Sequence, residues 1–286
     1  MTNLKPYTIN AVASIAMGIC AAQAAYAENK LFPTDVLNNG QFDATVDVNT
    51  EKTTQNYVFT PAEATAKYRN YTSQLSAAVR YGVNANFTIG VNTNVDRIKT
   101  IYTYNDYPAR YDYDAAGVHS NAIFARYAFV GNEKNAPFSL TGQLRALSYT
   151  DHNPNGEGYN SLVTQIIAGW DCGQGIRSYA DLHITTPDKA SHEKSIALVA
   201  GSWIPVSAAV TLDPYIELIH WSATSNIASV NGYSVGLAAY VDVGSNTYVV
   251  PSASYSKGTD YNTLNGLFDF RGAKTESAEV QLYHLF

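Results

Sequence analysis

The stretch Thr275-Glu-Ser-Ala-Glu-Val-Gln-Leu-Tyr-His-Leu-Phe286 decides how the rest of the chain is interpreted. Its residues alternate in polarity. The apolar set is largely Ala278, Val280, Leu282, His284 and Phe286, and the opposite set is Glu279, Gln281 and Tyr283. Because successive side chains of a β-strand point to opposite faces, this alternation predicts a strand with one apolar face and one polar face.

The same alternation returns along the chain, in segments separated by Gly, Pro, Asn and Asp. We expect strands at 41–52, 71–81, 87–100, 119–130, 138–149, 161–171, 176–186, 195–204, 209–222, 233–243, 247–256 and in the closing stretch. The polar residues after 52, the Tyr-rich stretch 101–117 and residues 257–274 are then loops. Connections from odd to even strands tend to be long, and those from even to odd strands tend to be short. Because strands and turns follow one another along the whole stretch from 41 to 286, one all-β domain is expected.

Strand length and charge placement favour a membrane barrel. The expected strands have about 10–13 residues, close to the ~9–11 that a tilted strand needs to cross a bilayer. Charged residues fall on the parity opposite the apolar set, which places the apolar face against lipid and the charged face toward a lumen. The sequence therefore predicts an all-β, transmembrane, antiparallel up-and-down barrel of about twelve strands. A soluble secreted β-protein, such as a lectin, is the alternative.

Aromatic residues near the strand ends support the same interpretation. Tyr and Trp suit the boundary between lipid and water because each joins an apolar ring to a polar atom. The expected members of these interface girdles are Tyr81, Tyr127, Phe129, Trp170, Trp203, Trp221 and Phe286.

The N-terminus has the features of a secretory signal peptide. Lys5 precedes an apolar stretch from about residue 9 to 22, and Ala25-Tyr26-Ala27 supplies a cleavage site. We expect a signal peptide at 1–27, a periplasmic segment at 28–40 and the barrel at 41–286. Cleavage would leave Cys172 as the single cysteine, without an intramolecular disulfide. The net charge of −6 becomes −7 when Lys5 is lost, which argues against nucleic-acid binding.

Three stretches resemble known outer-membrane proteins. The closing stretch resembles the last strand of bacterial outer-membrane barrels, whose terminal aromatic residue the barrel assembly machinery reads, and this assigns an assembly signal to Phe286. Leu31-Phe-Pro-Thr-Asp-Val-Leu-Asn-Asn-Gly40 and Arg80-Tyr-Gly-Val-Asn-Ala-Asn-Phe-Thr-Ile-Gly-Val91 resemble outer-membrane transporters of the meta-pathway phenol-degradation type. The resemblance implies location in the cell outer membrane, contact with its lipid, a barrel of about twelve strands and a transport role.

Charged residues on the polar parity are the candidate site. The expected pore-lining residues are Asp43, Asp47, Arg80, Arg126, Arg145, Arg177, Asp181, His183, Glu217 and Glu279. A barrel of about twelve strands leaves a narrow path, in which such side chains can select solutes. We therefore expect a channel or transporter for the passive uptake of small solutes. The alternative is a sealed structural or adhesive barrel that presents the Tyr-rich stretch 102–113.

An outer-membrane hydrolase is the weakest alternative. His119-Ser120-Asn121 has the residue types of outer-membrane phospholipase A, but adjacent residues of a regular strand point to opposite faces. A nucleophile and its base must share a face. The sequence accordingly predicts no enzymatic activity, no catalytic residue, no metal and no cofactor.

Overall fold

The structure is a computed structural model that describes residues 31–60, 64–104, 110–131, 136–150 and 158–286. The expected signal peptide, residues 1–27, lies outside the described residues. In these ranges every named element is a β-strand, and no helix is long and apolar enough to span a membrane.

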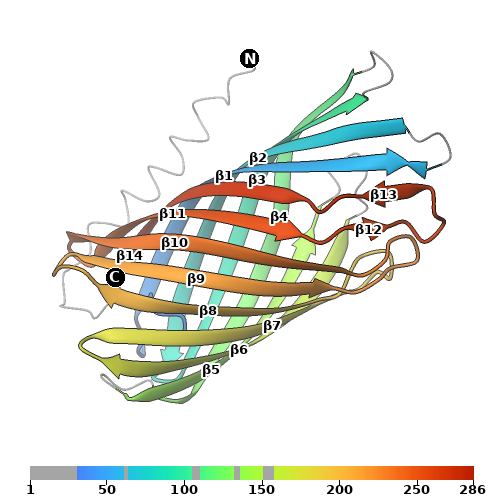
Figure 1. The fold of residues 1–286 in the computed structure, drawn as a ribbon. Coiled ribbons are helices and arrows are strands. Elements are labelled where there is room, and N and C mark those ends of the chain that lie inside the picture. Colours follow the sequence, from blue (N-terminus) through green and yellow to red (C-terminus); the bar gives the residue numbers. More distant parts are fainter. Residues whose placement is uncertain (1–30, 61–63, 105–109, 132–135, 151–157) are drawn as a thin grey trace.

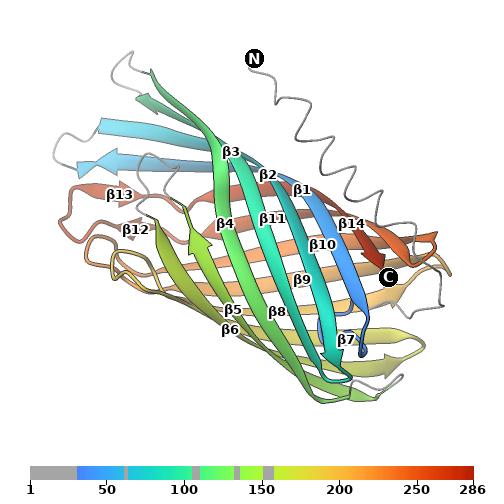
Figure 2. The ribbon, with the colours of Figure 1, turned by 180° about the vertical axis from the view of Figure 1, so that it is seen from behind.

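The strands pair in a simple order. They are β1 (Phe42–Phe59), β2 (Ala64–Asn84), β3 (Phe87–Tyr104), β4 (Arg110–Val130), β5 (Phe138–Tyr149), β6 (Tyr159–Gly173), β7 (Ile176–Pro187), β8 (Ser195–Pro205), β9 (Val210–Trp221), β10 (Val230–Gly244), β11 (Thr247–Gly258), β12 (Tyr261–Asn262), β13 (Phe268–Phe270) and β14 (Lys274–Leu285). Strands β1 to β11 pair antiparallel with their neighbours in sequence, and β14 pairs with both β11 and β1. This last pairing closes a barrel of 12 strands (Figures 1 and 2). The predicted all-β up-and-down barrel is confirmed.

The two faces of the wall differ as the alternation predicts. On the outer face, Val48, Ile123 and Val280 are more than half exposed. On the inner face, Asp43, Thr88 and Thr141 have no exposed surface. Closure lets every strand of the wall find a neighbour on both sides, which is the condition for a sheet to stand in hydrocarbon.

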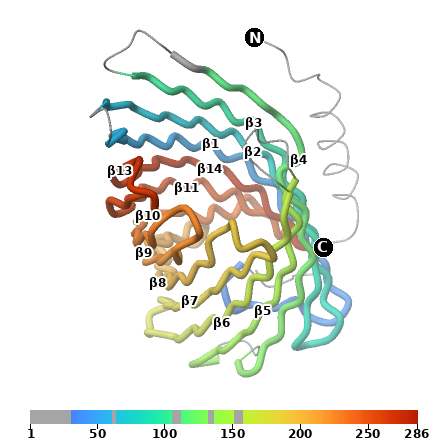
Figure 3. The backbone as a smooth tube through the Cα atoms, turned by 90° about the vertical axis from the view of Figure 1, so that its right-hand side faces the viewer, coloured from blue at the N-terminus to red at the C-terminus, as the bar shows by residue number. Residues whose placement is uncertain are grey.

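The first four strands are much longer than predicted. They contain 18, 21, 18 and 21 residues. The ladder continues after Thr54 on β1 and before Ser120 on β4, through the parts of β2 and β3 that lie between them. We name this part, which extends past the ends of the other strands, the projecting sheet (Figures 1 and 3). The loops expected after residue 52 and across 101–117 were therefore wrong for the described residues. Of the Tyr-rich stretch, residues 105–109 lie outside them.

A second correction concerns residues 257–274, which were expected to be a loop. They contain β12 and β13, and β13 pairs with the outer end of β1. Tyr57 lies within 6.0 Å of Phe268 and 5.7 Å of Phe270, measured between ring centroids. These aromatic contacts stabilise the pairing, because the rings bury apolar surface and the polar residues on either side have little to bury.

The short connections lie together at one end of the barrel. β2 joins β3, β6 joins β7 and β10 joins β11 through turns of two residues. Gln174, Ser245 and Asn246 have positive φ angles of 54°, 52° and 58° in two of these turns, as tight hairpins require. The prediction of short connections from even to odd strands is confirmed, and this end also holds Phe42 and Phe286.

Two of the expected girdle residues face the interior instead. Trp203 is 9% exposed and packs in a buried cluster with Phe32 and Tyr179. Trp221 pairs with Ser195, whose side chain is buried on the inner face. The girdle prediction was wrong for both because each lies on the inward parity of its strand, Trp203 with Ala197 and Trp221 with Asp213. Tyr81, Tyr127, Phe129 and Trp170 do lie exposed on the outer face.

Candidate functional site: the barrel lumen

Residues 31–40, which we name the lumen segment, enter the barrel at the end with the short turns: residues 31–37 lie inside, and residues 38–40 are exposed at the rim. Phe32 contacts β7 and β8, Thr34 contacts β5, and Leu37 contacts β3 and β14. These strands stand on different sides of a closed wall, so a chain that touches all of them runs through the interior. Phe32, Val36 and Leu37 are 1% exposed or less.

Phe32 anchors the lumen segment in an aromatic pocket. Its ring meets Tyr179 and Trp203 edge to face, with centroid separations of 5.9 Å and 5.4 Å. The guanidinium carbon of Arg177 lies 3.7 Å from the centroid of the Phe32 ring. Full burial of such a side chain stabilises by about 1.5–3 kcal/mol, and a cation over the ring adds to this.

Polar contacts fix the backbone of the segment. The Thr34 and Ser139 hydroxyls lie 2.7 Å apart, and the Thr141 hydroxyl donates to the Thr34 carbonyl at 2.6 Å. The Leu37 amide donates to the Thr88 hydroxyl at 2.9 Å. An extended segment in the lumen has no strand partner of its own, so side chains of the wall satisfy these groups.

Arg126 joins the lumen segment to the wall. Its Nη1 donates to the carbonyls of Pro33 and Asp35 at 3.2 Å and 3.1 Å. Its Nε donates to the side-chain amide oxygen Oε1 of Gln143 at 2.9 Å. From there a chain of hydrogen bonds crosses the next two strands, from Gln143 to Gln165 at 2.6 Å and from Gln165 to Asp181 at 2.7 Å.

Three further predicted residues, Asp43, Arg80 and Arg177, lie near this end. Arg80 Nε donates to both carboxylate oxygens of Asp43 at 3.0 Å, and Arg80 Nη2 also pairs with this carboxylate. The Asp43 side chain has no exposed surface, so this pair is closed to a passing solute. Arg177 Nη2 lies 3.5 Å from a carboxylate oxygen of Asp35.

The other predicted residues occupy separate parts of the inner wall. Asp181, His183 and Glu217 form one group, in which the His183 ring nitrogens lie 4.0 Å and 3.9 Å from the two carboxylates. Asp47 and Glu279 form a second. Because Asp47 pairs with Gln281, Glu279 is its diagonal neighbour on β14. Arg145 donates to the Asn92 side chain at 2.9 Å and joins neither group.

Glycines let aromatic rings lie flat against the inner wall. The Tyr215 ring covers Gly236 on the next strand, and the Phe124 ring covers Gly90, so a Cβ atom at either glycine would collide with the ring. A ring that lies along the wall occupies less of the lumen cross-section than one that points inward. These glycines therefore widen the path rather than bend the strand.

No sequence pattern marks the residues that hold the lumen segment. Ser139, Thr141 and Thr88 are small polar side chains of a kind found in every strand. Gln143 and Gln165 are directly paired across β5 and β6, which becomes visible only when the register is known. The stretch 31–40 is identified in the sequence only by its family resemblance.

A β-bulge alters the prediction for His119 and Ser120. Asn94 pairs with Ser120 and Val95 with Val118, so His119 is the extra residue. As a result both side chains lie on the inner face: His119 Nδ1 is 3.1 Å from Asp96, and the Ser120 hydroxyl accepts a hydrogen bond from Asn94 at 2.8 Å. The prediction of opposite faces was wrong, since a bulge interrupts the alternation. Among the described residues, no group of three or more His, Cys, Asp or Glu side chains is placed to hold a metal ion.

Comparisons by sequence give no relative. No protein-family profile matches the chain, and no curated protein sequence matches it.

Comparisons by structure identify the fold. The chain is similar to the COG4313 outer membrane channel from Pseudomonas putida F1, with a TM-score of 0.59, 11% identity and coverage of 91% of this chain and 100% of that one. A NanC porin matches with a TM-score of 0.46 and 10% identity over 82% of this chain and 98% of that one. A FadL homologue from Pseudomonas aeruginosa matches with a TM-score of 0.45 and 9% identity over 87% and 90%. The fold is thus that of a bacterial outer-membrane β-barrel, and the narrower resemblance to phenol-degradation transporters stays a hypothesis.

Proposed function

We propose that the chain forms an outer-membrane channel for the passive uptake of small solutes through a narrow, charged lumen. One observation carries the proposal: a closed barrel with an apolar outer face has a polar inner face that includes Asp47, Arg145, Asp181, Glu217 and Glu279. A barrel that only needed to be sealed could fill its interior with apolar side chains at lower cost. Phe286 serves as the signal for the barrel assembly machinery. The segment 28–40 belongs to the periplasmic end of the barrel, and Phe32, Thr34 and Leu37 of this segment lie inside the lumen there.

The lumen segment narrows the proposed path at one end. Arg80, Arg126 and Arg177 are engaged there, with Asp43 or with the segment itself. Asp47, Arg145, Asp181, His183, Glu217 and Glu279 are then the proposed selective residues along the path. A path lined by both signs of charge favours small polar solutes over bulky apolar ones.

A planar bilayer experiment tests the channel. The purified barrel, shown to be folded by its heat-modifiable migration on a gel, should give discrete conductance steps. A folded protein that leaves the bilayer silent would overturn the proposal. Identical migration of boiled and unboiled samples would instead count against a membrane barrel.

A sealed barrel is the second candidate, and the lumen segment is the observation that favours it. The Thr34 and Ser139 hydroxyls are 2.7 Å apart, so cysteines at these positions should form a disulfide once the exposed Cys172 is replaced by Ser. Conductance that appears only after reduction would show that the segment must leave for solutes to pass. Equal conductance in both states would show that the path runs beside the segment. Silence in both states supports the sealed barrel.

A further inference from the structure

We propose that the outer face of β2 to β6 binds one molecule of membrane lipid, with an acyl carbonyl at a row of polar side chains and the acyl chain in a groove beside it. The row consists of Thr93, Asn121, Ser148 and Asn160, which are successive cross-strand partners on β3, β4, β5 and β6. All four are exposed on the outer face. Polar side chains on the lipid-facing wall are costly unless something satisfies them.

The row runs from within the apolar wall to its rim. Ser148 and Asn160 lie one residue from the ends of β5 and β6. At the rim, the Asn160 amide donates to Asp188 at 2.8 Å. Thr93 and Asn121 lie deeper, next to Val91 and Ile123, which are 54% and 65% exposed. The row therefore connects water at the rim to a point inside the apolar belt.

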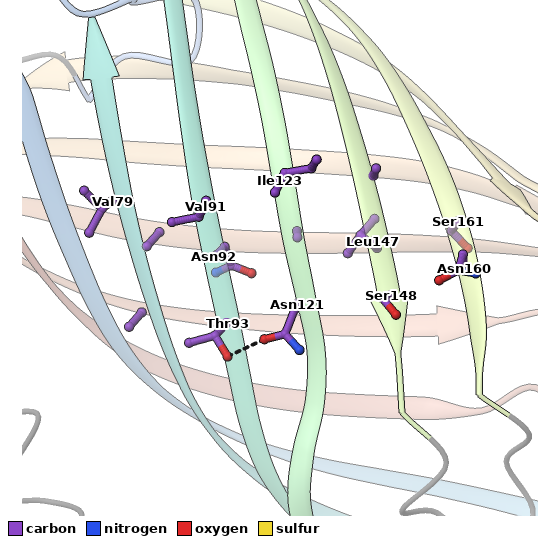
Figure 4. A pocket seen from close by; sticks show the side chains of 14 residues that line it. Val79, Val91, Asn92, Thr93, Asn121, Ile123, Leu147, Ser148, Asn160 and Ser161 are labelled. Carbon is purple, nitrogen blue, oxygen red and sulfur yellow. Dashed lines mark hydrogen bonds between the residues drawn. The ribbon is translucent and has the colours of Figure 1, made fainter.

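Asn121 offers hydrogen-bond donors to the lipid. The Thr93 hydroxyl donates to the Asn121 carbonyl oxygen at 2.8 Å (Figure 4). This bond occupies the acceptor of the Asn121 side chain and leaves its two N–H groups directed to the outer face. In the apolar belt there is no bulk water to accept these bonds. An ester or amide carbonyl, such as joins an acyl chain to a lipid headgroup, supplies the missing acceptor.

A groove for the acyl chain begins at the polar row. One hollow of about 690 Å³ is lined by the row and by Val79, Val91, Ile123 and Ala146. These last four residues also line a second hollow of about 580 Å³, which continues toward Tyr81 and Leu144. The two hollows are thus continuous. The small side chains of Ala125 and Ala146, on the outer face, lower its floor between the larger aliphatic residues.

The shape and chemistry of the groove favour lipid over a second barrel. A neighbouring barrel would present a convex wall, which touches the groove's edges without filling it. An acyl chain is narrow enough to lie along the floor and is apolar throughout, and the residues that line the second hollow are apolar apart from Arg80 and Tyr81. Its carbonyl end would meet the polar row at the rim side, so both ends of the groove find a matching chemical group.

Native mass spectrometry tests this site. The barrel is reconstituted in nanodiscs of palmitoyl-oleoyl phosphatidylethanolamine and released into mild detergent, and one lipid should remain bound per chain. Ala146→Phe fills the groove floor and should abolish the retained lipid. Asn121→Leu removes the donors and should lower lipid retention by about two- to tenfold. Ala239→Phe, an equal change on the outer face of β10, should leave retention unaltered.

The possible outcomes are distinct. The absence of bound lipid on the unmodified chain, or equal loss in Ala146→Phe and Ala239→Phe, would overturn the lipid site. A species of twice the chain mass that Ala146→Phe disperses would show that a second copy occupies the groove and would overturn it as well. Circular dichroism and heat-modifiable migration confirm that each variant is folded. The result does not depend on conductance, so the channel and the lipid site can fail separately.

Discussion

The ring of Phe286 stacks on the ring of Phe42, with centroids 4.3 Å apart and planes within 7° of parallel. The Phe286 amide also donates to the Phe42 carbonyl at 2.9 Å. Phe42 begins β1, and Phe286 follows directly after β14. The aromatic pair therefore stabilises the seam, by which we mean the junction of β1 and β14 at which the barrel closes.

Replacing Phe286 by Ala should weaken that seam. An aromatic pair contributes about 0.5–1.5 kcal/mol beyond the burial of its area, and the proposed assembly signal is lost with it. We expect less folded barrel and a lower temperature for the loss of heat-modifiable migration. Phe129→Ala removes a ring that is 59% exposed on the outer face and is the matched control. Equal yield and equal melting of the two variants would contradict a role at the seam.

Arg126→Gln should loosen the lumen segment and increase conductance. The change removes two hydrogen bonds from a charged donor to the Pro33 and Asp35 carbonyls, each worth about 1.5–3 kcal/mol. Single-channel current measures the effect. Arg145→Gln removes the same charge from a position that does not contact the segment, and it separates release of the segment from electrostatics. The same conductance in both variants would show that Arg126 does not hold the segment in place.

Gly236→Ala should reduce conductance by moving one ring. The new methyl group would occupy the position of the Tyr215 ring, so the ring must turn away from the wall and into the lumen. Tyr215→Ser in the same background removes the ring and should restore the current. If the double variant conducts as poorly as Gly236→Ala, the loss comes from the strand and not from the ring.

The inner wall should make the channel prefer cations. The acids Asp47, Asp181, Asp213, Glu217 and Glu279 outnumber Arg126 and Arg145, while Asp43 and Asp35 are paired with Arg80 and Arg177. Glu217→Gln and Glu279→Gln together should shift the reversal potential in a salt gradient toward anions. Arg126→Glu or Arg177→Glu should shift it the other way. Unchanged potentials would place these residues away from the ion path.

Acid should loosen the segment between β11 and β14. Asp260 accepts hydrogen bonds from the Gly272 amide at 2.7 Å and from Arg271 at 3.0 Å, and these contacts lower the pKa of its carboxyl. A lowered pKa means that the contacts stabilise the fold above about pH 4 and are lost as pH falls through the folded-state value. Pepsin should cleave near Phe268 and Phe270 faster at about pH 2.5 than at pH 4.5, after correction for its own activity.

Asp260→Asn is the control for this effect. The variant lacks the carboxylate at every pH, so its cleavage should already be fast at the higher pH. A parallel pH dependence in the two proteins would assign the effect to another group.

The sequence predicted the wall because lipid and water impose opposite requirements on alternate residues. The inner and outer faces of β5, β7 and β14 follow from the two-residue period alone. The short turns at Gly173–Gly175 and Gly244–Asn246 follow from their Gly and Asn residues. The same period could not show where a strand passes beyond the membrane. The outer ends of β1 to β4 are polar on one face and contain scattered Tyr residues, which resembles a loop until cross-strand partners are known.

The lumen shows the same division between sequence and fold. The parity of Asp47, Arg126, Asp181 and Glu279 follows from their strands. Which charges meet, however, depends on the register between strands and on the lumen segment, which no sequence pattern places inside the barrel. A bulge of one residue also reverses the side chain of His119. The alternation along the chain is enough to assign each regular residue to one side of the wall, since that side depends only on neighbours along the chain. The contacts of Arg126 with Pro33 and of Phe42 with Phe286 follow only from the folded barrel, because closure brings residues so distant in sequence together.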